Sequence, residues 1–240
     1  NLKDEDIKKL FTGENYKELL HYLNPIKYRI VMDDKIICNK IFSKYLKRSY
    51  IDLRVCSLEV FKEFLKGKEN VFAKLVDGFG GAGVVKIKVN DIKDYKKLYN
   101  ELCKNRQFLV EEEIKQHKTL TEINPAAVNN IRVVTLLKDN KVYYIERILR
   151  INDGLTDTIS SHDIQGRLDE EFNLISDMVD DDLNIYKTHP VTGFKFEGIK
   201  IPNAKSVYEL IERAAREIAN IRFIGWDIAI TPDGADIIEV

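Results

Sequence analysis

The chain has 240 residues, of which 44% are hydrophobic and 32% are charged, and its formal net charge is −1. This composition is that of an ordinary soluble globular protein, with enough chain for one large domain or two small lobes. The near-neutral charge excludes a global field that attracts nucleic acid or an anionic membrane, and no apolar run approaches the roughly 20 residues that span a bilayer.

The first residues, NLKDEDIKKL, lack the pattern of a signal peptide. Cys38, Cys56 and Cys103 are widely spaced and do not have the spacing of metal ligands. Cysteines of this kind are typical of reduced, buried thiols in a reducing compartment. We therefore expect a cytoplasmic protein.

The first half of the chain predicts a helical start followed by mixed elements. Charged helical spacing indicates a short helical segment over residues 1–27 and a further helix over 33–48, behind two aspartates. Residues 50–114 are predicted to run strand, helix, strand, glycine-rich loop, strand, helix, strand. Ser57 and Asp91 are the expected N-caps of the two helices in this stretch.

The second half is richer in long strands and loops. Two long strands are predicted around Asp139-Asn140, then a loop-rich acidic stretch, a helix over 203–221 and two closing strands. We therefore expect an α+β protein whose two lobes share a cleft. Its expected parts are a helical segment (1–27), a small lobe (28–114) and a large lobe (115–240).

A glycine-rich loop is predicted between two strands of the small lobe. Gly78, Gly80, Gly81 and Gly83 match the pattern G-x-G-x-x-G. A dinucleotide-binding fold needs a helix after these glycines, whereas a strand follows them here. The Gly-Lys-Ser/Thr of a Walker loop and the His-Arg-Asp and Asp-Phe-Gly signatures of protein kinases are also missing. What remains is a hairpin that folds over triphosphate, or a flexible hairpin tip without a ligand.

Lys74 favours the phosphate-binding interpretation of this hairpin. It lies on the strand that leads into the loop, between Ala73 and Leu75. A lysine within an apolar strand usually needs an anion nearby. The alternative is that the alternation of the strand directs Lys74 to solvent.

The closing strands place two carboxylates in apolar surroundings. Residues 231–234, Thr-Pro-Asp-Gly, predict a type I turn within a three-residue hairpin loop. This loop pairs Asp227 with Glu239, with Cβ atoms about 4.5–5.5 Å apart. Two carboxylates so close should repel unless a cation such as Mg²⁺ lies between them. A two-residue loop would instead place Asp227 opposite Ile238 and Glu239 on the other face.

Together these features resemble the ATP-grasp superfamily and, more narrowly, its sugar-transfer-associated branch, which is found near bacterial polysaccharide genes. The resemblance covers about residues 30–240. It rests on the order and spacing of Lys74 with the glycine loop, Phe108–Ile114, Gln116-His117, Asn129–Arg132, His189–Gly193 and Gly225–Ala229.

The resemblance implies two α/β lobes with mainly antiparallel sheets that clamp ATP, and it implies a role for each matching residue. Lys35 and Lys74 would hold the ATP phosphates, and Gly80 and Gly81 would close over them. The remaining implied groups are adenine and ribose contacts (Glu111, Glu112, Ile114), Mg²⁺ ligands (Asp227, Glu239), arginines facing the γ-phosphate or acyl-phosphate (Arg132, Arg150), and substrate contacts (Asp157, His189).

Arg132 and Arg150 lie on the two strands joined at Asp139-Asn140. The length of this loop decides which face of the hairpin Arg150 occupies, and the sequence allows two lengths. If Asp139-Asn140 is a two-residue loop, Lys138 pairs with Lys141 and Arg132 faces Arg147. A three-residue loop brings Arg150 to the face of Arg132. Two cations on one face would themselves imply an anion between them.

The family pattern differs from this sequence at three places. Asn130 stands where the branch has threonine, and Thr158, His162 and Asp163 stand where it has an asparagine and paired glycines. The pattern also continues with an asparagine after Val240. These differences concern the substrate loop and the metal site.

The function implied by the resemblance is an ATP- and Mg²⁺-dependent ligase. It would convert a small or sugar-linked carboxylate into an acyl-phosphate and pass it to an amine or another nucleophile. Capsular or other cell-surface polysaccharide biosynthesis is the implied setting. An ATP-grasp kinase that phosphorylates a hydroxyl and a non-catalytic nucleotide-binding module are the alternatives.

Overall fold

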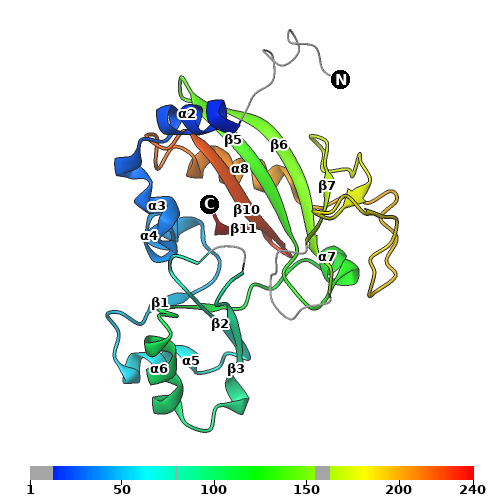
Figure 1. Cartoon of the computed structure of the whole chain (residues 1–240). Coiled ribbons are helices and arrows are strands. Elements are labelled where there is room, and N and C mark those ends of the chain that lie inside the picture. The colour runs from blue at the N-terminus through cyan, green and yellow to red at the C-terminus, as the bar shows by residue number, and fades with distance from the viewer. Residues whose placement is uncertain (1–12, 79–80, 155–162) are drawn as a thin grey trace.

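The computed structural model describes residues 13–78, 81–154 and 163–240. Figure 1 shows two lobes, each built on an antiparallel sheet, with the smaller lobe below the larger. The α+β architecture predicted from the sequence is confirmed.

The small lobe has the predicted order of elements. Its sheet has the strand order β1-β4-β2-β3, and all its strand pairs are antiparallel. The lobe consists of β1 (Tyr50–Asp52), α5 (Leu58–Leu65), β2 (Asn70–Lys74), β3 (Val85–Lys88), the 3₁₀ turn η3 (Val89–Asp91), α6 (Tyr95–Lys104) and β4 (Leu109–Glu112).

One of the two predicted helix caps in this lobe is wrong. Ser57 caps α5 by accepting from the backbone of Val60, as expected. The helix α6 is capped by Asp94, which accepts from the backbone N–H of Lys97 at 2.9 Å, rather than by Asp91. The backbone N–H of Val89 donates to the carbonyl of Glu69, which continues the strand pairing into η3. Asp91 therefore lies in η3, and the helix begins later.

The large lobe is organised around a seven-stranded sheet. Its strand order is β11-β10-β5-β6-β7-β8-β9. The strands are β5 (Asn130–Lys138), β6 (Lys141–Asn152), β7 (Asp163–Arg167), β8 (Met178–Val179), β9 (Ile185–Tyr186), β10 (Phe223–Thr231) and β11 (Gly234–Glu239). The helical elements outside the small lobe are α2 (Gly13–Leu23), η1 (Ile26–Tyr28), α3 (Ile30–Asp33), α4 (Lys35–Ile41), η2 (Ser43–Tyr45), α7 (Lys118–Ile123) and α8 (Ala204–Ala214).

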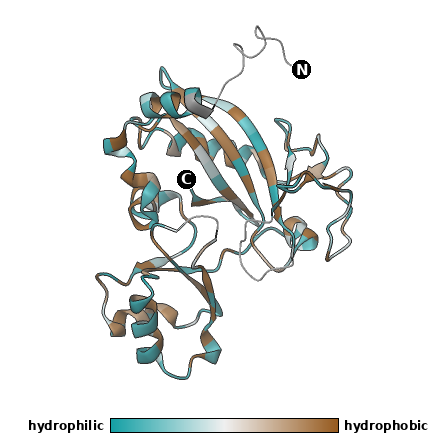
Figure 2. Ribbon diagram, in the orientation of Figure 1, coloured by the Kyte–Doolittle hydropathy of each residue, from teal (hydrophilic) through white to brown (hydrophobic). Residues whose placement is uncertain are grey.

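Among the long strands, β5 buries alternate residues, whereas β10 is buried on both faces over most of its length. Figure 2 shows hydrophobic and hydrophilic residues alternating along them, as a two-residue period requires. Trp226 is fully buried, packs edge-to-face on Phe42 with ring centroids 5.5 Å apart, and donates its indole N–H to Thr135 at 2.8 Å. The helix α8 contributes Val207 and Ile211 to the same core.

The residues before β1 pack against both lobes, and the predicted start of the small lobe at residue 28 stays a prediction. Val31, Cys38 and Phe42 belong to the core of the large lobe. The small-lobe core begins with side chains of the β1 region, such as Leu53. Ile36 of α4 packs instead with Val76 and Leu109 of the small lobe, so α3 and α4 form a junction between the two lobes (Figure 1).

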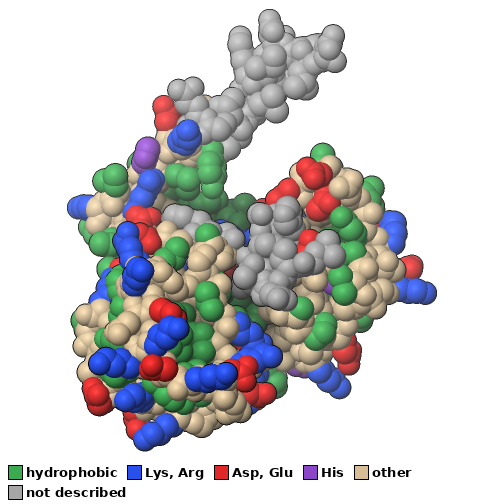
Figure 3. Space-filling model, turned by 60° about the horizontal axis from the view of Figure 1, so that its bottom comes forward, with side chains coloured by type: hydrophobic (Ala, Val, Ile, Leu, Met, Phe, Trp, Pro, Cys, Tyr) green, Lys and Arg blue, Asp and Glu red, His purple; other side chains and the backbone are tan. Residues whose placement is uncertain are grey.

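The surface carries mixed charges. Figure 3 shows Lys or Arg and Asp or Glu side chains interspersed over the small lobe, which this view brings forward. Among the described helices, none combines the length and the apolar character needed to cross a membrane.

Candidate active site

Lys74 turns toward an anion. It is the last residue of β2, its side chain is only 12% exposed, and its ammonium lies 2.5 Å from Oε2 of Glu111 on β4. Phe72 pairs with Glu111 and Lys74 with Leu109, so Lys74 and Glu111 are diagonal neighbours on one face of the sheet. The predicted strand position of Lys74 is confirmed, and the solvent-facing alternative does not hold.

Glu111 is a buried carboxylate held by two cations. Oε1 accepts from Nε and Nη2 of Arg48 at 3.1 and 2.9 Å and from the amide of Asn39 at 2.7 Å. Burial alone would raise the pKa of Glu111, but Arg48 and Lys74 lower it to about 2. The carboxylate of Glu111 is thus engaged by cations, and its predicted contact with adenine or ribose stays a prediction.

Three of the other predicted nucleotide contacts lie within the described residues. The carboxylate of Glu112 accepts from the Ser49 hydroxyl at 2.7 Å, and Ile114 is half-buried just after β4 ends. Gly81 has φ of 77°, a left-handed conformation that favours glycine in the predicted hairpin. Gly80 lies outside the described residues.

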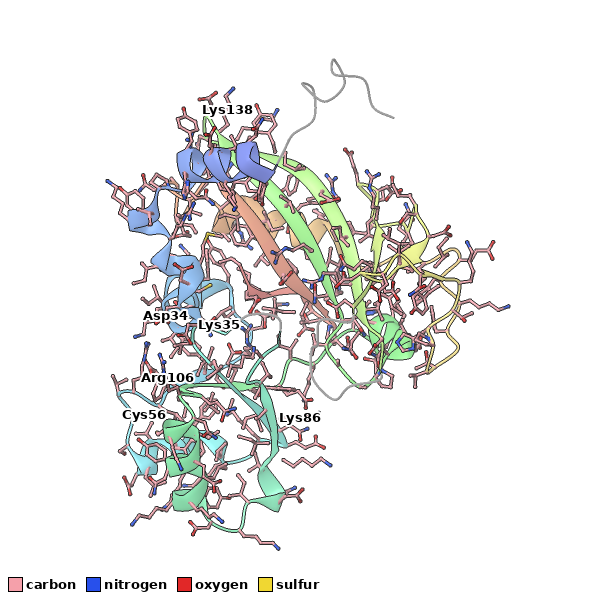
Figure 4. All side chains as sticks on the ribbon, in the orientation of Figure 1. Asp34, Lys35, Cys56, Lys86, Arg106 and Lys138 are labelled. Carbon is pink, nitrogen blue, oxygen red and sulfur yellow. The ribbon has the colours of Figure 1, made fainter. Side chains whose placement is uncertain are left out.

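Lys35 connects the glycine hairpin to the last strand. Asp34 caps α4 by accepting from the N–H groups of Ile36 and Ile37 at 2.8 and 3.0 Å, which fixes the first helical residue, Lys35. The ammonium of Lys35 donates to the carbonyl of Gly78 and lies 3.5 Å from Oε2 of Glu239. Figure 4 shows Asp34 and Lys35 at the junction of the two lobes.

A small cavity brings these predicted residues together. Lys35, Lys74, Glu111 and Glu239 line it, with apolar neighbours that include Leu109. Its volume is about 40 Å³. Ligand pockets usually measure a few hundred Å³, so a nucleotide would enter only if the lobes separate further at this point.

Asp227 and Glu239 face each other across β10 and β11, but not through the predicted loop. Thr231 pairs with Gly234, so the hairpin has a two-residue loop and the predicted three-residue loop is wrong. A bulge at Ile238, which has no partner between Ile237 and Glu239, then shifts the register by one residue. Asp227 consequently pairs with Glu239, as the sequence predicted.

The hairpin of β5 and β6, which carries Arg132 and Arg150, also combines a two-residue loop with a bulge. Lys138 pairs with Lys141 across a two-residue loop, and Ile145 is left unpaired further along. Beyond this bulge Arg132 pairs with Ile148, so Arg150 lies on the face of Arg132, as a three-residue loop would also have given.

Both arginines converge on Asp227. Nη1 of Arg132 lies 2.9 Å and Nη1 of Arg150 lies 3.5 Å from Oδ1 of Asp227. Arg150 also pairs with Asp163 at the start of β7, at 2.9 Å. Burial raises the pKa of Asp227, and the charge of Glu239 raises it further, although Arg132 and Arg150 lower it.

Asp163 and Arg48 are buried site residues that the sequence did not indicate. Burial raises the pKa of Asp163, against the lowering effect of Arg150. Asp163 lies beside the substrate loop, where the departure from the family pattern was the only signal. Arg48 comes just before a short strand and has no local signal at all.

Gly225 makes room for Arg132. A Cβ atom at this position would lie 2.7 Å from Nε and 2.8 Å from Cζ of the Arg132 guanidinium. A larger residue at position 225 would therefore displace the guanidinium of Arg132 from the place it has here.

The two predicted substrate contacts, His189 and Asp157, stay predictions. His189 is 1% exposed; its Nε2 lies 2.9 Å from the carbonyl of Asn152, and its Nδ1 accepts from the N–H groups of Val191 and Thr192. His189 thus holds its own loop in place, with neither ring nitrogen left for a substrate. Asp157 lies outside the described residues.

The carboxylates fit a magnesium ion that is shared with a phosphorylated ligand. Within the described part of the chain, no cluster of three or more His, Cys, Asp or Glu side chains could hold a metal alone. Mg²⁺ usually binds through one or two carboxylates together with substrate phosphates and water. Asp227 and Glu239 supply such a pair, and Lys35 lies against Glu239.

The family model for sugar-transfer associated ATP-grasp proteins matches residues 14–240. A search of curated proteins found no match.

Solved structures of ATP-grasp ligases share the fold at low identity. The D-alanine-D-alanine ligase of Coxiella burnetii is 11% identical with a TM-score of 0.50, over 89% of this chain and 48% of that one. The ATP-grasp ligase PsnB with its minimal precursor is 14% identical with a TM-score of 0.53, over 90% of this chain and 54% of that one.

A second PsnB structure contains a phosphomimetic variant of the minimal precursor, Mg and ADP. It is 14% identical with a TM-score of 0.50, over 90% of this chain and 52% of that one. The chain thus spans about half the length of these ligases.

Proposed function

The chain belongs to the sugar-transfer associated ATP-grasp family, and on that basis we propose that it is an ATP- and Mg²⁺-dependent ligase. In the proposed reaction, a carboxylate oxygen of the substrate attacks the γ-phosphorus of ATP and ADP leaves. An amine or another nucleophile then attacks the acyl carbon, loses its proton and displaces phosphate.

One observation carries the proposal: residues far apart in sequence bring together lysines, which suit phosphates, and carboxylates, which suit Mg²⁺, at the junction of the two lobes. Lys35 and Lys74 line the same cavity as Glu239. Glu239 pairs in turn with Asp227, on which two arginines converge. Charges of both signs at the lobe junction suit a triphosphate and its divalent cation.

Each group has a separate task in this reaction. Lys35 and Lys74 would hold the phosphates of ATP, and Asp227 and Glu239 would hold Mg²⁺. The ion would neutralise charge on the phosphates during transfer. Arg132 and Arg150 would stabilise the oxygens of the transferred phosphoryl group and of the acyl-phosphate.

The similar proteins support two further parts of the proposal, the class of reaction and its place in the cell. D-Alanine-D-alanine ligase and PsnB are ligases by their descriptions, which favours ligation over transfer to a hydroxyl. The sugar-transfer association of the family supports a role in capsular or other cell-surface polysaccharide biosynthesis. A reaction that consumes ATP places the proposed activity in the cytoplasm.

Nucleotide binding tests the first part of the proposal. Millimolar ATP with Mg²⁺ should raise the melting temperature of the wild-type chain, and Lys74→Met should abolish this shift. Lys138→Met is the control, because Lys138 lies at the tip of the hairpin far from the cleft (Figure 4). A wild-type chain without any shift would refute the proposal.

Trapping tests the reaction class. With ATP, Mg²⁺ and a panel of amino-acid and sugar carboxylates, hydroxylamine should convert the acyl-phosphate into a hydroxamate. Release of ADP with polyols but no hydroxamate with any carboxylate would show a kinase instead of a ligase.

A further inference from the structure

Arg48 is buried at the point where the chain passes from the large lobe into the small one. Its side chain is 3% exposed, and it stands between η2 and β1. On one side it pairs with Glu111 of the small lobe at 2.9 Å, and on the other with Asp236 of the large lobe at 3.2 Å. Arg48 therefore joins the two lobes through a buried triad of charges.

Every N–H group of the Arg48 guanidinium has an acceptor. Nε and Nη2 donate to Glu111, and Nη1 donates to Asp236. Nη1 also donates to the carbonyl of Ile237 at 2.6 Å, and Nη2 to the carbonyl of Ile238 at 3.2 Å. These five bonds use all five donors of an arginine, whereas a lysine has only three.

These bonds reach both halves of the candidate active site. Ile238 is the bulge residue that turns Glu239 toward Asp227, and Arg48 binds its carbonyl. On the other side, Oε2 of Glu111 lies 2.5 Å from Lys74. Arg48 thus binds the carboxylate that contacts Lys74, and it binds the carbonyl of the residue next to Glu239.

We propose that Arg48 is a positioning residue that holds Lys74 and Glu239 in one fixed arrangement, so that ATP and Mg²⁺ strengthen each other's binding. This role rests on the proposed function. A lone surface ion pair would carry no such argument, but the contacts of Arg48 are buried, complete and directed at both sides of the cleft. Arg48 itself touches neither proposed ligand.

The test measures how strongly Mg²⁺ enhances ATP binding. The Kd for ATP is measured by calorimetry with Mg²⁺ and with EDTA, and the ratio of the two values defines the enhancement. Arg48→Lys should reduce this ratio at least fivefold. The matched control is Arg147→Lys, because Arg147 binds Tyr208 at 2.6 Å in the large lobe, away from the cleft; its ratio should stay within twofold of wild type.

Two further measurements keep the outcomes distinct. Near-ultraviolet circular dichroism shows whether Arg48→Lys folds. If it does not, the same ratio is measured for Asp236→Asn, which keeps the shape of the triad and should reduce the ratio about threefold. An unchanged ratio in the folded variant would overturn the role of Arg48 alone. A wild-type chain that binds no ATP under either condition would overturn the proposed function, and the role of Arg48 with it.

Discussion

Glu111→Gln tests how much the buried charge network stabilises the protein. The substitution keeps the shape of the side chain and removes its charge, so it mimics the protonated carboxyl group. The pKa of Glu111 falls from an ordinary 4.5 to about 2 in the folded chain. At 1.36 kcal/mol for each pH unit, this corresponds to about 3 kcal/mol of stability at neutral pH.

The pH dependence of this contribution has a definite sign. Because the folded-state pKa is lower than the unfolded one, the stabilisation is complete above about pH 4.5 and is lost as the pH falls toward 2. We therefore expect Glu111→Gln to lower the free energy of unfolding by about 3 kcal/mol at pH 7 and by clearly less at pH 3.

Urea unfolding followed by the fluorescence of Trp226 measures both values, provided that the slope with denaturant is unchanged. Glu113→Gln is the control: Glu113 pairs with Lys86 at 2.7 Å, its side chain is 31% exposed, and its loss should cost less than about 1 kcal/mol. A loss below 1 kcal/mol for Glu111→Gln at pH 7, or one that does not shrink at pH 3, would refute the reasoning.

Three further substitutions separate activity from stability. Gly225→Ala should push the guanidinium of Arg132 away from Asp227 and lower kcat/KM at least tenfold, while a melting curve shifts by only a few degrees. Asp227→Asn should raise the Mg²⁺ concentration for half-maximal activity more than tenfold, and an unchanged magnesium titration would contradict the assigned ligand. His189→Phe should lower stability by about 1–3 kcal/mol, because two loop N–H groups lose their acceptor, without changing KM for ATP; a change in KM alone would instead indicate a substrate contact.

The hairpins show what local sequence can and cannot predict. The predicted pairing of Asp227 with Glu239 is present, but not for the predicted reason. The loop length was wrong in that hairpin, and a compensating bulge at Ile238 restored the pairing. No residue type marks a bulge in advance, since its position depends on what the neighbouring strands and side chains accept.

Buried partners at long range were invisible for a different reason. Arg48 binds Glu111 and Asp236, which lie 63 and 188 positions away in the chain. A lone arginine in sequence reads as a surface residue, because arginine is almost never fully buried without partners. The hydrogen bonds of His189 were equally invisible in the sequence, since its partners are backbone groups of Asn152, Val191 and Thr192 that no pattern specifies.

The bulges also set a rule for how this chain can change in length. In the closing hairpin, a three-residue loop without a bulge and a two-residue loop with the bulge at Ile238 give the same pairing of Asp227 with Glu239. A deletion of Ile238 would remove the bulge and still leave Asp227 opposite Glu239, because the register set by the two-residue loop then continues to the carboxylates. The same deletion would take away the carbonyl that Nη2 of Arg48 binds, so the shortened strand would keep the carboxylate pair and lose one of its contacts with Arg48.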